Sequence, residues 1–169
     1  HEGDLFISIH CNSFPKNKRV RGTEVFFLGS GKSKTAFDVM MRENSVVKIE
    51  DPEARVEIPE EELLIYELAN SGYQATSQQI AVMIAEQFKD RARRKSRGVK
   101  QAGFQVLYQA SMPAVLVEVG FITNPSEQRF LTSDYGQSII ASAIYRAVRD
   151  YKLDVERSET TSFTTSRSN

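Results

Sequence analysis

Residues 114–121 read AVLVEVGF, and this stretch decides the fold class of the chain. Every position except Glu118 and Gly120 is apolar, which is the pattern of a strand buried on both faces, as in a parallel sheet. The following residues, Asn124-Pro125-Ser126-Glu127, predict a helix start with an Asn N-cap, Pro at the first helical position and Glu at the third. The stretch therefore predicts a central strand that leads into a helix.

Strands and helices alternate along the rest of the chain. We expect the other strands at residues 4–10 (DLFISIH, buried on both faces), 22–28 (GTEVFFL) and 104–108. We expect helices at residues 33–43, at about 77–89 with Thr76 and Gln79 in capping-box spacing, and along an apolar stripe from Ile139 to Tyr151. This order predicts an α/β fold with a mostly parallel or mixed sheet flanked by helices.

Three segments carry little apolar pattern. Residues 50–67 are strongly acidic and predict an exposed excursion, and residues 89–100 form a basic cluster, which is most simply a solvated helix end and loop. After Leu153 the chain is rich in Ser and Thr, so residues 154–169 predict a disordered tail or a linker.

The composition excludes several classes of protein. The chain has 169 residues, 22 Lys and Arg and 22 Asp and Glu, so its net charge is zero and does not favour a general binder of polyanions. No apolar run reaches the roughly 18 residues of a membrane span. The single cysteine excludes a disulfide-dependent fold. The chain begins at His1 rather than Met, which we attribute to processing, to the design of the expressed segment or to a partial sequence.

Glu118 and His10 are the candidate functional residues. Ionised carboxylates are rarely left unpaired in apolar surroundings, so Glu118 either lies near a metal, acts as a base with a raised pKa, or faces a cleft. The alternative is a carboxylate on a solvated sheet face or in a structural ion pair. His10 ends the first strand, where an imidazole can bind zinc, although a satisfied core histidine is the simpler interpretation of a lone His.

Other chemical motifs are weaker. Cys11 follows His10 on the opposite side of the strand, so we interpret it as a packing residue rather than a nucleophile. Gly31-Lys32-Ser33 resembles the end of a phosphate-binding loop, but Phe26 occupies the position that requires Gly. The basic cluster lacks interleaved aromatics, and a nucleic-acid binder would show steep salt dependence.

Four segments together resemble the zinc-dependent N-acetylmuramoyl-L-alanine amidases of the amidase-3 family, which are bacterial cell-wall hydrolases. They are DLFISIHCNS (4–13), RGTEVFFL (21–28), RGVKQAGFQVL (97–107) and PAVLVEVGFITNPSEQRFL (113–131), and they occur in the order found in the family. The resemblance covers about residues 3–151 and implies a catalytic domain over residues 1–153.

The resemblance also implies a mechanism. In this family two His and one Glu hold Zn²⁺, and His10 corresponds to the second His ligand by its match in SIHCNS. Glu118 corresponds to the catalytic glutamate by its match in VEVGFITNP. The expected reaction is hydrolysis of the amide bond between N-acetylmuramic acid and L-alanine in peptidoglycan, with Glu118 as general base. The expected location is the periplasm or the cell exterior.

Two expectations concern parts of the family pattern that differ here. The other two zinc ligands precede the segment matched by residues 4–10, so we expect this α/β fold to be incomplete at its N-terminus. Residues 43–75 correspond to an insertion that covers the active site in some members and is released by an activator protein, and Glu43 and Glu60–Glu62 could then occlude or ligate the site. The alternative function is a catalytically inactive module that binds peptidoglycan or a division partner.

Overall fold

The computed structural model describes the chain except residues 1–2, 31–32, 51–52, 54–58 and 167–169, and it describes the backbone alone at 47–50 and 159–166. Four strands form one sheet in the order β1-β4-β2-β3. They are β1 (Phe6–Asn12), β2 (Thr23–Leu28), β3 (Ser96–Ala102) and β4 (Ala114–Phe121). β1 is parallel to β4 and β2 is parallel to β3, whereas β2 and β4 are antiparallel. The predicted α/β fold with a mixed sheet is confirmed.

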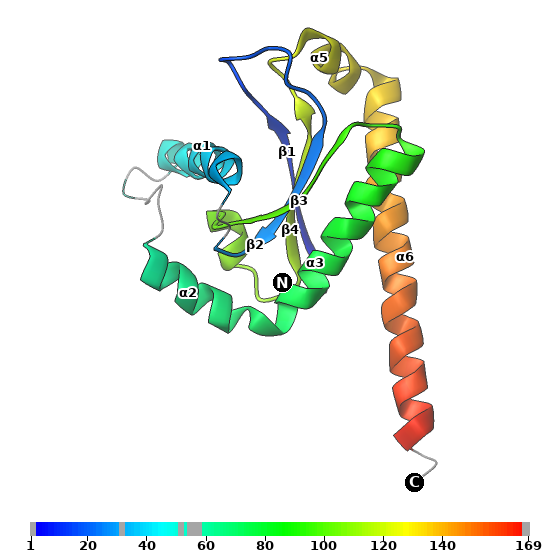
Figure 1. The fold of residues 1–169 in the computed structure, drawn as a ribbon. Helices are drawn as coiled ribbons and strands as arrows, with labels where there is room; N and C mark the ends of the chain where they lie inside the picture. The colour runs from blue at the N-terminus through cyan, green and yellow to red at the C-terminus, as the bar shows by residue number, and fades with distance from the viewer. Residues whose placement is uncertain (1–2, 31–32, 51–52, 54–58, 167–169) are drawn as a thin grey trace.

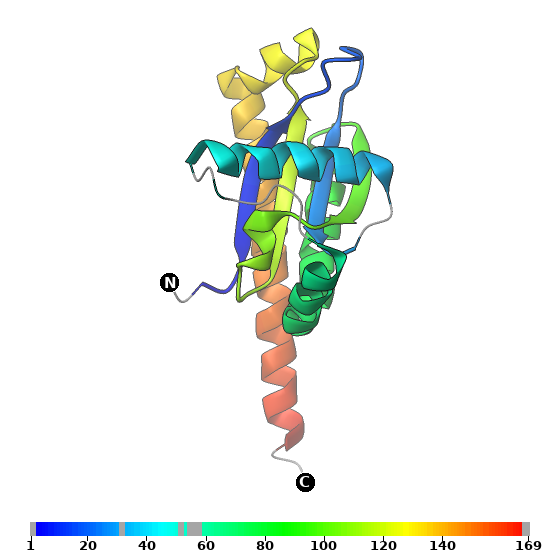
Figure 2. The same ribbon diagram turned by 90° about the vertical axis from the view of Figure 1, so that its left-hand side faces the viewer.

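Helices cover both faces of this sheet (Figure 1). They are α1 (Lys34–Glu50), α2 (Glu60–Ala69), α3 (Ser71–Glu86), the π-helical turn η1 (Gln87–Arg91), α4 (Gln105–Tyr108), α5 (Pro125–Leu131) and α6 (Asp134–Ser166). α3 and α6 pack on one face, and α1 crosses the other face in front of the strands (Figure 2). No helix in the described part of the chain is long and apolar enough for a membrane span.

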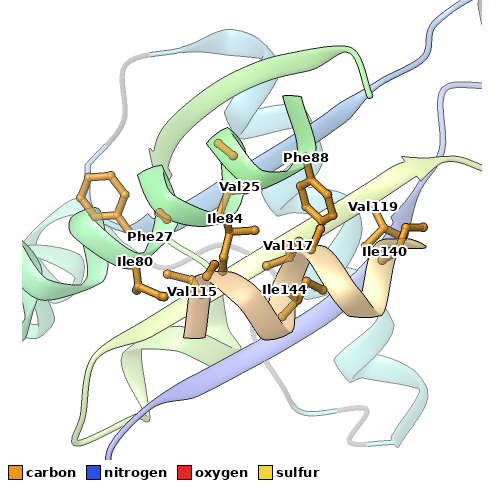
Figure 3. Close-up of a cluster of buried hydrophobic side chains, with 14 of the residues drawn as sticks. Val25, Phe27, Ile80, Ile84, Phe88, Val115, Val117, Val119, Ile140 and Ile144 are labelled. Carbon is orange, nitrogen blue, oxygen red and sulfur yellow. The ribbon is translucent and has the colours of Figure 1, made fainter. Parts of the chain in front are cut away.

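The alternation of side chains along β4 and β2 divides the core into two layers. The odd-numbered residues pack against α3 and α6 (Figure 3), and they include Val25, Phe27, Val115, Val117 and Val119. The even-numbered residues pack on the α1 and α4 side, and they include Phe26, Leu28, Ala114 and Leu116. Each large apolar side chain buried here contributes roughly 1.5–3 kcal/mol relative to exposure. The same alternation assigns the next even-numbered positions, Glu24 and Glu118, to the α1 face.

The predicted helix start after β4 is confirmed. The Asn124 side-chain oxygen accepts hydrogen bonds from the backbone N–H groups of Ser126 (3.0 Å) and Glu127 (3.2 Å). The Glu127 carboxylate accepts from the N–H groups of Phe121 and Gly22 and pairs with Arg94. It therefore joins the end of β4 to the two segments that lead into β2 and β3.

The third strand lies earlier than predicted. Residues 104–108 are not a strand, because Gln105–Tyr108 forms the short helix α4 and the strand is Ser96–Ala102. β3 is an edge strand whose residues are mostly half-buried, so its sequence lacks the apolar run that the prediction required. In the segment 104–108, the buried Phe104 and Leu107 are three residues apart, which is helical spacing.

The first strand is in the predicted place but is not buried on both faces. β1 is the other edge of the sheet, and the Ile9 side chain is 58% exposed. An apolar run alone cannot distinguish a central strand from an edge strand, because that difference depends on the partners that the strand finds.

The helix boundaries also differ. α1 continues to Glu50, and α3 begins at Ser71, so Thr76 and Gln79 lie inside α3 and the predicted capping box is wrong. α6 continues through Ser166, beyond the predicted apolar stripe that ends at Tyr151. The domain boundary at residue 153 and the interpretation of residues 154–169 as a disordered tail or a linker stay predictions.

Candidate active site

Three polar side chains form a row across neighbouring strands. His10 of β1 is the register partner of Glu118 in β4, and Glu118 is also the register partner of Glu24 in β2. Directly paired residues project from the same face of a sheet. The row therefore lies on the face that α1 crosses (Figure 2). Residues that are distant in sequence thus meet at one place in the fold.

Glu118 is the most unusual group in the row. It is 0% exposed, and neither carboxylate oxygen has a hydrogen-bond partner in the structure as described. Burial raises the pKa of Glu118 to about 8, with further contributions from the negative charges of Glu43 and Glu24 and an opposing one from Arg42. Among the described residues, Glu118 therefore has no ion-pair partner, and its side chain does not lie on a solvated face of the sheet. A buried carboxyl group of this kind can hold or release a proton near neutral pH.

This carboxyl group should make the stability of the metal-free protein depend on pH. The folded protein keeps the Glu118 proton up to about pH 8, whereas the ordinary pKa of the side chain is 4.5. Folding therefore takes up a proton between these values, and the free energy of unfolding should fall by a few kcal/mol as the pH rises through this range. Urea unfolding in a chelating buffer at several pH values measures the effect. A Glu118→Gln variant should lose this pH dependence of the free energy of unfolding. If its free energy of unfolding fell with pH as steeply as that of the wild type, Glu118 would not be the titrating group.

Glu24 is buried but fully partnered, in contrast to Glu118. One oxygen accepts hydrogen bonds from Arg97 Nε (2.8 Å) and Lys100 Nζ (2.7 Å), and the other accepts from Asn12 Nδ2 (3.1 Å). Two cations and an amide therefore compensate its charge. Asn12 in turn accepts from Arg42 on α1, at 2.7 Å. This network connects β1, β2, β3 and α1 beside Glu118.

His10 has partners at both ring nitrogens. Its Nε2 lies 2.7 Å from the Ser8 hydroxyl, and its Nδ1 lies 2.8 Å from a carboxylate oxygen of Glu43 on α1. A cavity of about 230 Å³ opens beside this pair, with Phe104 and Leu116 in its apolar wall. The imidazole is therefore neither a simple core residue nor free to accept a new ligand without a rearrangement.

The described residues do not form a complete metal site. Among them, no group of three or more His, Cys, Asp or Glu side chains is arranged to hold a metal ion. Cys11 is exposed, so its interpretation as a packing residue is wrong. Of the acidic run Glu60–Glu62, Glu60 and Glu61 line a different cavity, together with Ser30 and Glu67.

The sequence interpretation missed the network around Glu118. Glu24 carries the same signal as Glu118, a carboxylate inside an apolar strand, and this signal could have identified it. Arg97 and Lys100 belong to the basic cluster, which was interpreted as a solvated helix end and loop. Both lie in β3 and face Glu24, which the pairing of strands alone reveals.

Comparison with known proteins points to the same family that the sequence motifs resemble. A family model described as N-acetylmuramoyl-L-alanine amidase matches residues 1–150. The amidase AmiA of Escherichia coli is 32% identical over 153 residues, which cover 89% of this chain and 53% of AmiA. AmiA of Salmonella typhimurium is 31% identical over 153 residues, which again cover 89% of this chain and 53% of the relative. The chain thus spans about half the length of these relatives.

Solved structures share the fold. An N-acetylmuramoyl-L-alanine amidase from Clostridium difficile 630 superposes with a TM-score of 0.60 at 21% identity, over 89% of this chain and 58% of that one. The CwlD amidase of Clostridioides difficile, solved in complex with the GerS lipoprotein, gives a TM-score of 0.58 at 24% identity, over 91% and 56%.

Proposed function

The chain belongs to the N-acetylmuramoyl-L-alanine amidase family, amidase-3, and from this membership we propose that it acts as a peptidoglycan amidase. The proposed reaction is hydrolysis of the amide bond between the lactyl group of N-acetylmuramic acid and L-alanine of the stem peptide. Because this substrate lies in the cell envelope, the proposed location is the periplasm or the cell exterior.

One observation carries this proposal. Glu118 is a fully buried carboxyl group without a hydrogen-bond partner among the described residues, and it lies directly opposite His10. Keeping such a group in a protein costs several kcal/mol, which structural packing does not explain. A role in chemistry at this position does explain it.

Zinc is the proposed cofactor, with His10 as one ligand. The donor set fits in part, since His10 supplies an imidazole and Glu118 has two unpaired oxygens nearby, but the described residues provide no three-ligand group. Only His10 among the described residues is therefore proposed as a zinc ligand. Bound zinc supplies a polarised carbonyl and a water of lowered pKa.

Glu118 is the proposed general base. Its carboxylate would accept the proton of the attacking water and pass it to the leaving nitrogen of L-alanine. The apolar wall of Phe104 and Leu116 beside His10 would exclude bulk water, and the hydrogen bonds of Glu24 would keep the neighbouring strand ends in register.

Product analysis tests this function directly. The full-length protein that contains this chain is incubated with purified peptidoglycan, and the soluble products are identified by mass spectrometry. We expect stem peptides with a free L-alanine amino group and glycan with a free lactyl carboxyl group. Products cleaved within the glycan or within the peptide would refute the proposed bond.

We also propose that α1 restrains the site. The Glu43 carboxylate of α1 is hydrogen-bonded to His10 Nδ1, and the Arg42 guanidinium of α1 donates to the Asn12 side chain. Both contacts must break if α1 leaves the site. The following helix α2 exposes Leu64, Ile65 and Leu68 at 64%, 65% and 75%. Exposed apolar side chains of this size suit an activator protein that would bind α2 and draw α1 away. The assignment of residues 43–75 to a regulatory insertion remains part of this proposal.

Removing the contact of Glu43 should raise basal activity. We expect Glu43→Ala to increase the rate of peptidoglycan hydrolysis without a partner protein about fivefold or more, because His10 becomes available. Dye release from labelled peptidoglycan measures the rate. Glu61→Ala on α2 removes the same group at an exposed position and should leave the rate unchanged. A Glu43→Ala variant as slow as the wild type would contradict the restraint.

The alternative function is an inactive binding module of the same fold. The occupied imidazole of His10, whose two ring nitrogens contact Ser8 and Glu43, favours it. It predicts no hydrolysis by the full-length protein and retained binding to peptidoglycan.

A further inference from the structure

Two basic segments come together at one end of the sheet. The loop between β1 and β2 carries Lys16, Lys18, Arg19 and Arg21, and the segment between η1 and β3 carries Arg93 and Lys95. All six side chains are exposed, and none forms a salt bridge with another described residue. We refer to these six residues as the basic rim.

The backbone fixes the two halves of the basic rim against each other. Thr23 N–H donates to the Lys95 carbonyl oxygen at 2.8 Å. Gly22 has φ of 112°, and a Cβ at this position would collide with the same carbonyl, so glycine permits the close approach. The Glu127 carboxylate then holds both Gly22 and Arg94. The two segments of the basic rim are therefore joined through their backbones, although they are far apart in sequence.

The charge of the basic rim is not compensated locally. Arg94, Arg97 and Lys100 of the same basic sequence are half-buried and pair with Glu127 and Glu24. Within the described part of the chain the rim residues have no such partners, while the whole chain has no net charge. The balancing carboxylates include those of the acidic first turn of α2. Charge is thus separated across the surface, and the basic rim would attract an extended anion.

The basic rim borders the proposed site. Its loop leaves β1 immediately after Asn12 and is attached to the end of β4 by a hydrogen bond from Phe14 N–H to the Thr123 hydroxyl at 2.9 Å. It returns to the sheet at Thr23, next to Glu24. An anionic polymer lying on the rim would therefore lie next to the strand ends that carry the row of His10, Glu118 and Glu24.

We propose that the basic rim binds the carboxylates of several stem peptides at once, so that the protein prefers intact, polymeric peptidoglycan to small soluble fragments. This inference rests on the proposed function. Six exposed cations over two segments offer several points of attachment, and a peptidoglycan network presents carboxylates repeatedly. Because exposed charges are screened by salt, this preference should weaken as ionic strength rises.

Sedimentation with insoluble peptidoglycan tests the proposal. The full-length protein carrying Glu118→Gln, which leaves the substrate intact, is mixed with purified sacculi at increasing NaCl. We expect Lys18→Glu/Arg19→Glu and Arg21→Glu/Lys95→Glu to weaken binding at low salt about tenfold or more. The matched control, Arg149→Glu/Lys152→Glu, makes the same charge change on α6 and should bind as the parent does.

A second assay separates this proposal from the proposed function. With Glu118 intact, the rim variants should hydrolyse a soluble muropeptide within about twofold of the wild-type rate but degrade sacculi more slowly. If the wild type and the Glu43→Ala variant hydrolyse neither the muropeptide nor the sacculi, the proposed function fails while rim binding can still be measured. The proposal would be overturned if the rim variants bound sacculi as tightly as the parent. It would also be overturned if binding survived amidation of the sacculus carboxylates and was lost on removal of wall phosphates.

Discussion

Glu118→Gln is expected to lower the rate of amide hydrolysis by the full-length protein about 10²- to 10⁴-fold, the usual contribution of a general base. Glutamine preserves the size of the side chain in its fully buried position but cannot accept a proton from water. It also removes the group that is costly to ionise in the apolar site. The variant should therefore lose kcat and still unfold at a temperature equal to or above that of the wild type at pH 8. Muropeptide release and thermal unfolding measure the two effects.

The control for this variant is Glu61→Gln, which makes the same substitution in the exposed first turn of α2. It should change neither the rate nor the melting temperature. A wild-type rate in Glu118→Gln would remove the general base from the proposal. Loss of activity together with a large fall in melting temperature would assign Glu118 a structural role instead.

His10→Ala is expected to remove bound zinc and activity together. Mutation of a residue that only orients a metal ligand typically lowers metal affinity or activity about 10- to 100-fold. Loss of a ligand itself should lower them by more than this. Because His10 is partly exposed and its partners are Ser8 and Glu43, the core should keep its packing. Metal content by elemental mass spectrometry and hydrolysis of a muropeptide measure the outcome in the full-length protein.

Ser8→Ala is the matched comparison, since it removes the contact of His10 Nε2 and retains the imidazole. We expect this variant to keep one equivalent of zinc. A His10→Ala protein with full zinc content would show that His10 is not a ligand, whatever its activity.

Strong local patterns predicted the centre of the fold correctly. The apolar run 114–121 is the fully buried strand β4, and the Asn124 cap begins α5 as expected. These features depend on residues close together in sequence, so a pattern can reveal them. Glu118 was conspicuous for the same reason, because a carboxylate contradicts the strand around it.

Features that depend on distant partners were not predictable in this way. β3 was missed because its polar residues find their partner, Glu24, in another strand. The start of α3 was placed too late because Ser77 lies inside the helix, where its hydroxyl bonds the Tyr73 carbonyl and accepts from Ala114 N–H. The edge position of β1 likewise follows from the strand order and not from its own apolar sequence.

The parallel pairing of β1 with β4 has a consequence for biosynthesis. His10 and Glu118 are far apart in the sequence, and parallel strands of this separation pair late in folding. A nascent chain that ends before β4 has emerged from the ribosome contains the imidazole but not its carboxyl neighbour. If the proposed function holds, catalytic competence would therefore arise in a single late step, when β4 pairs with β1.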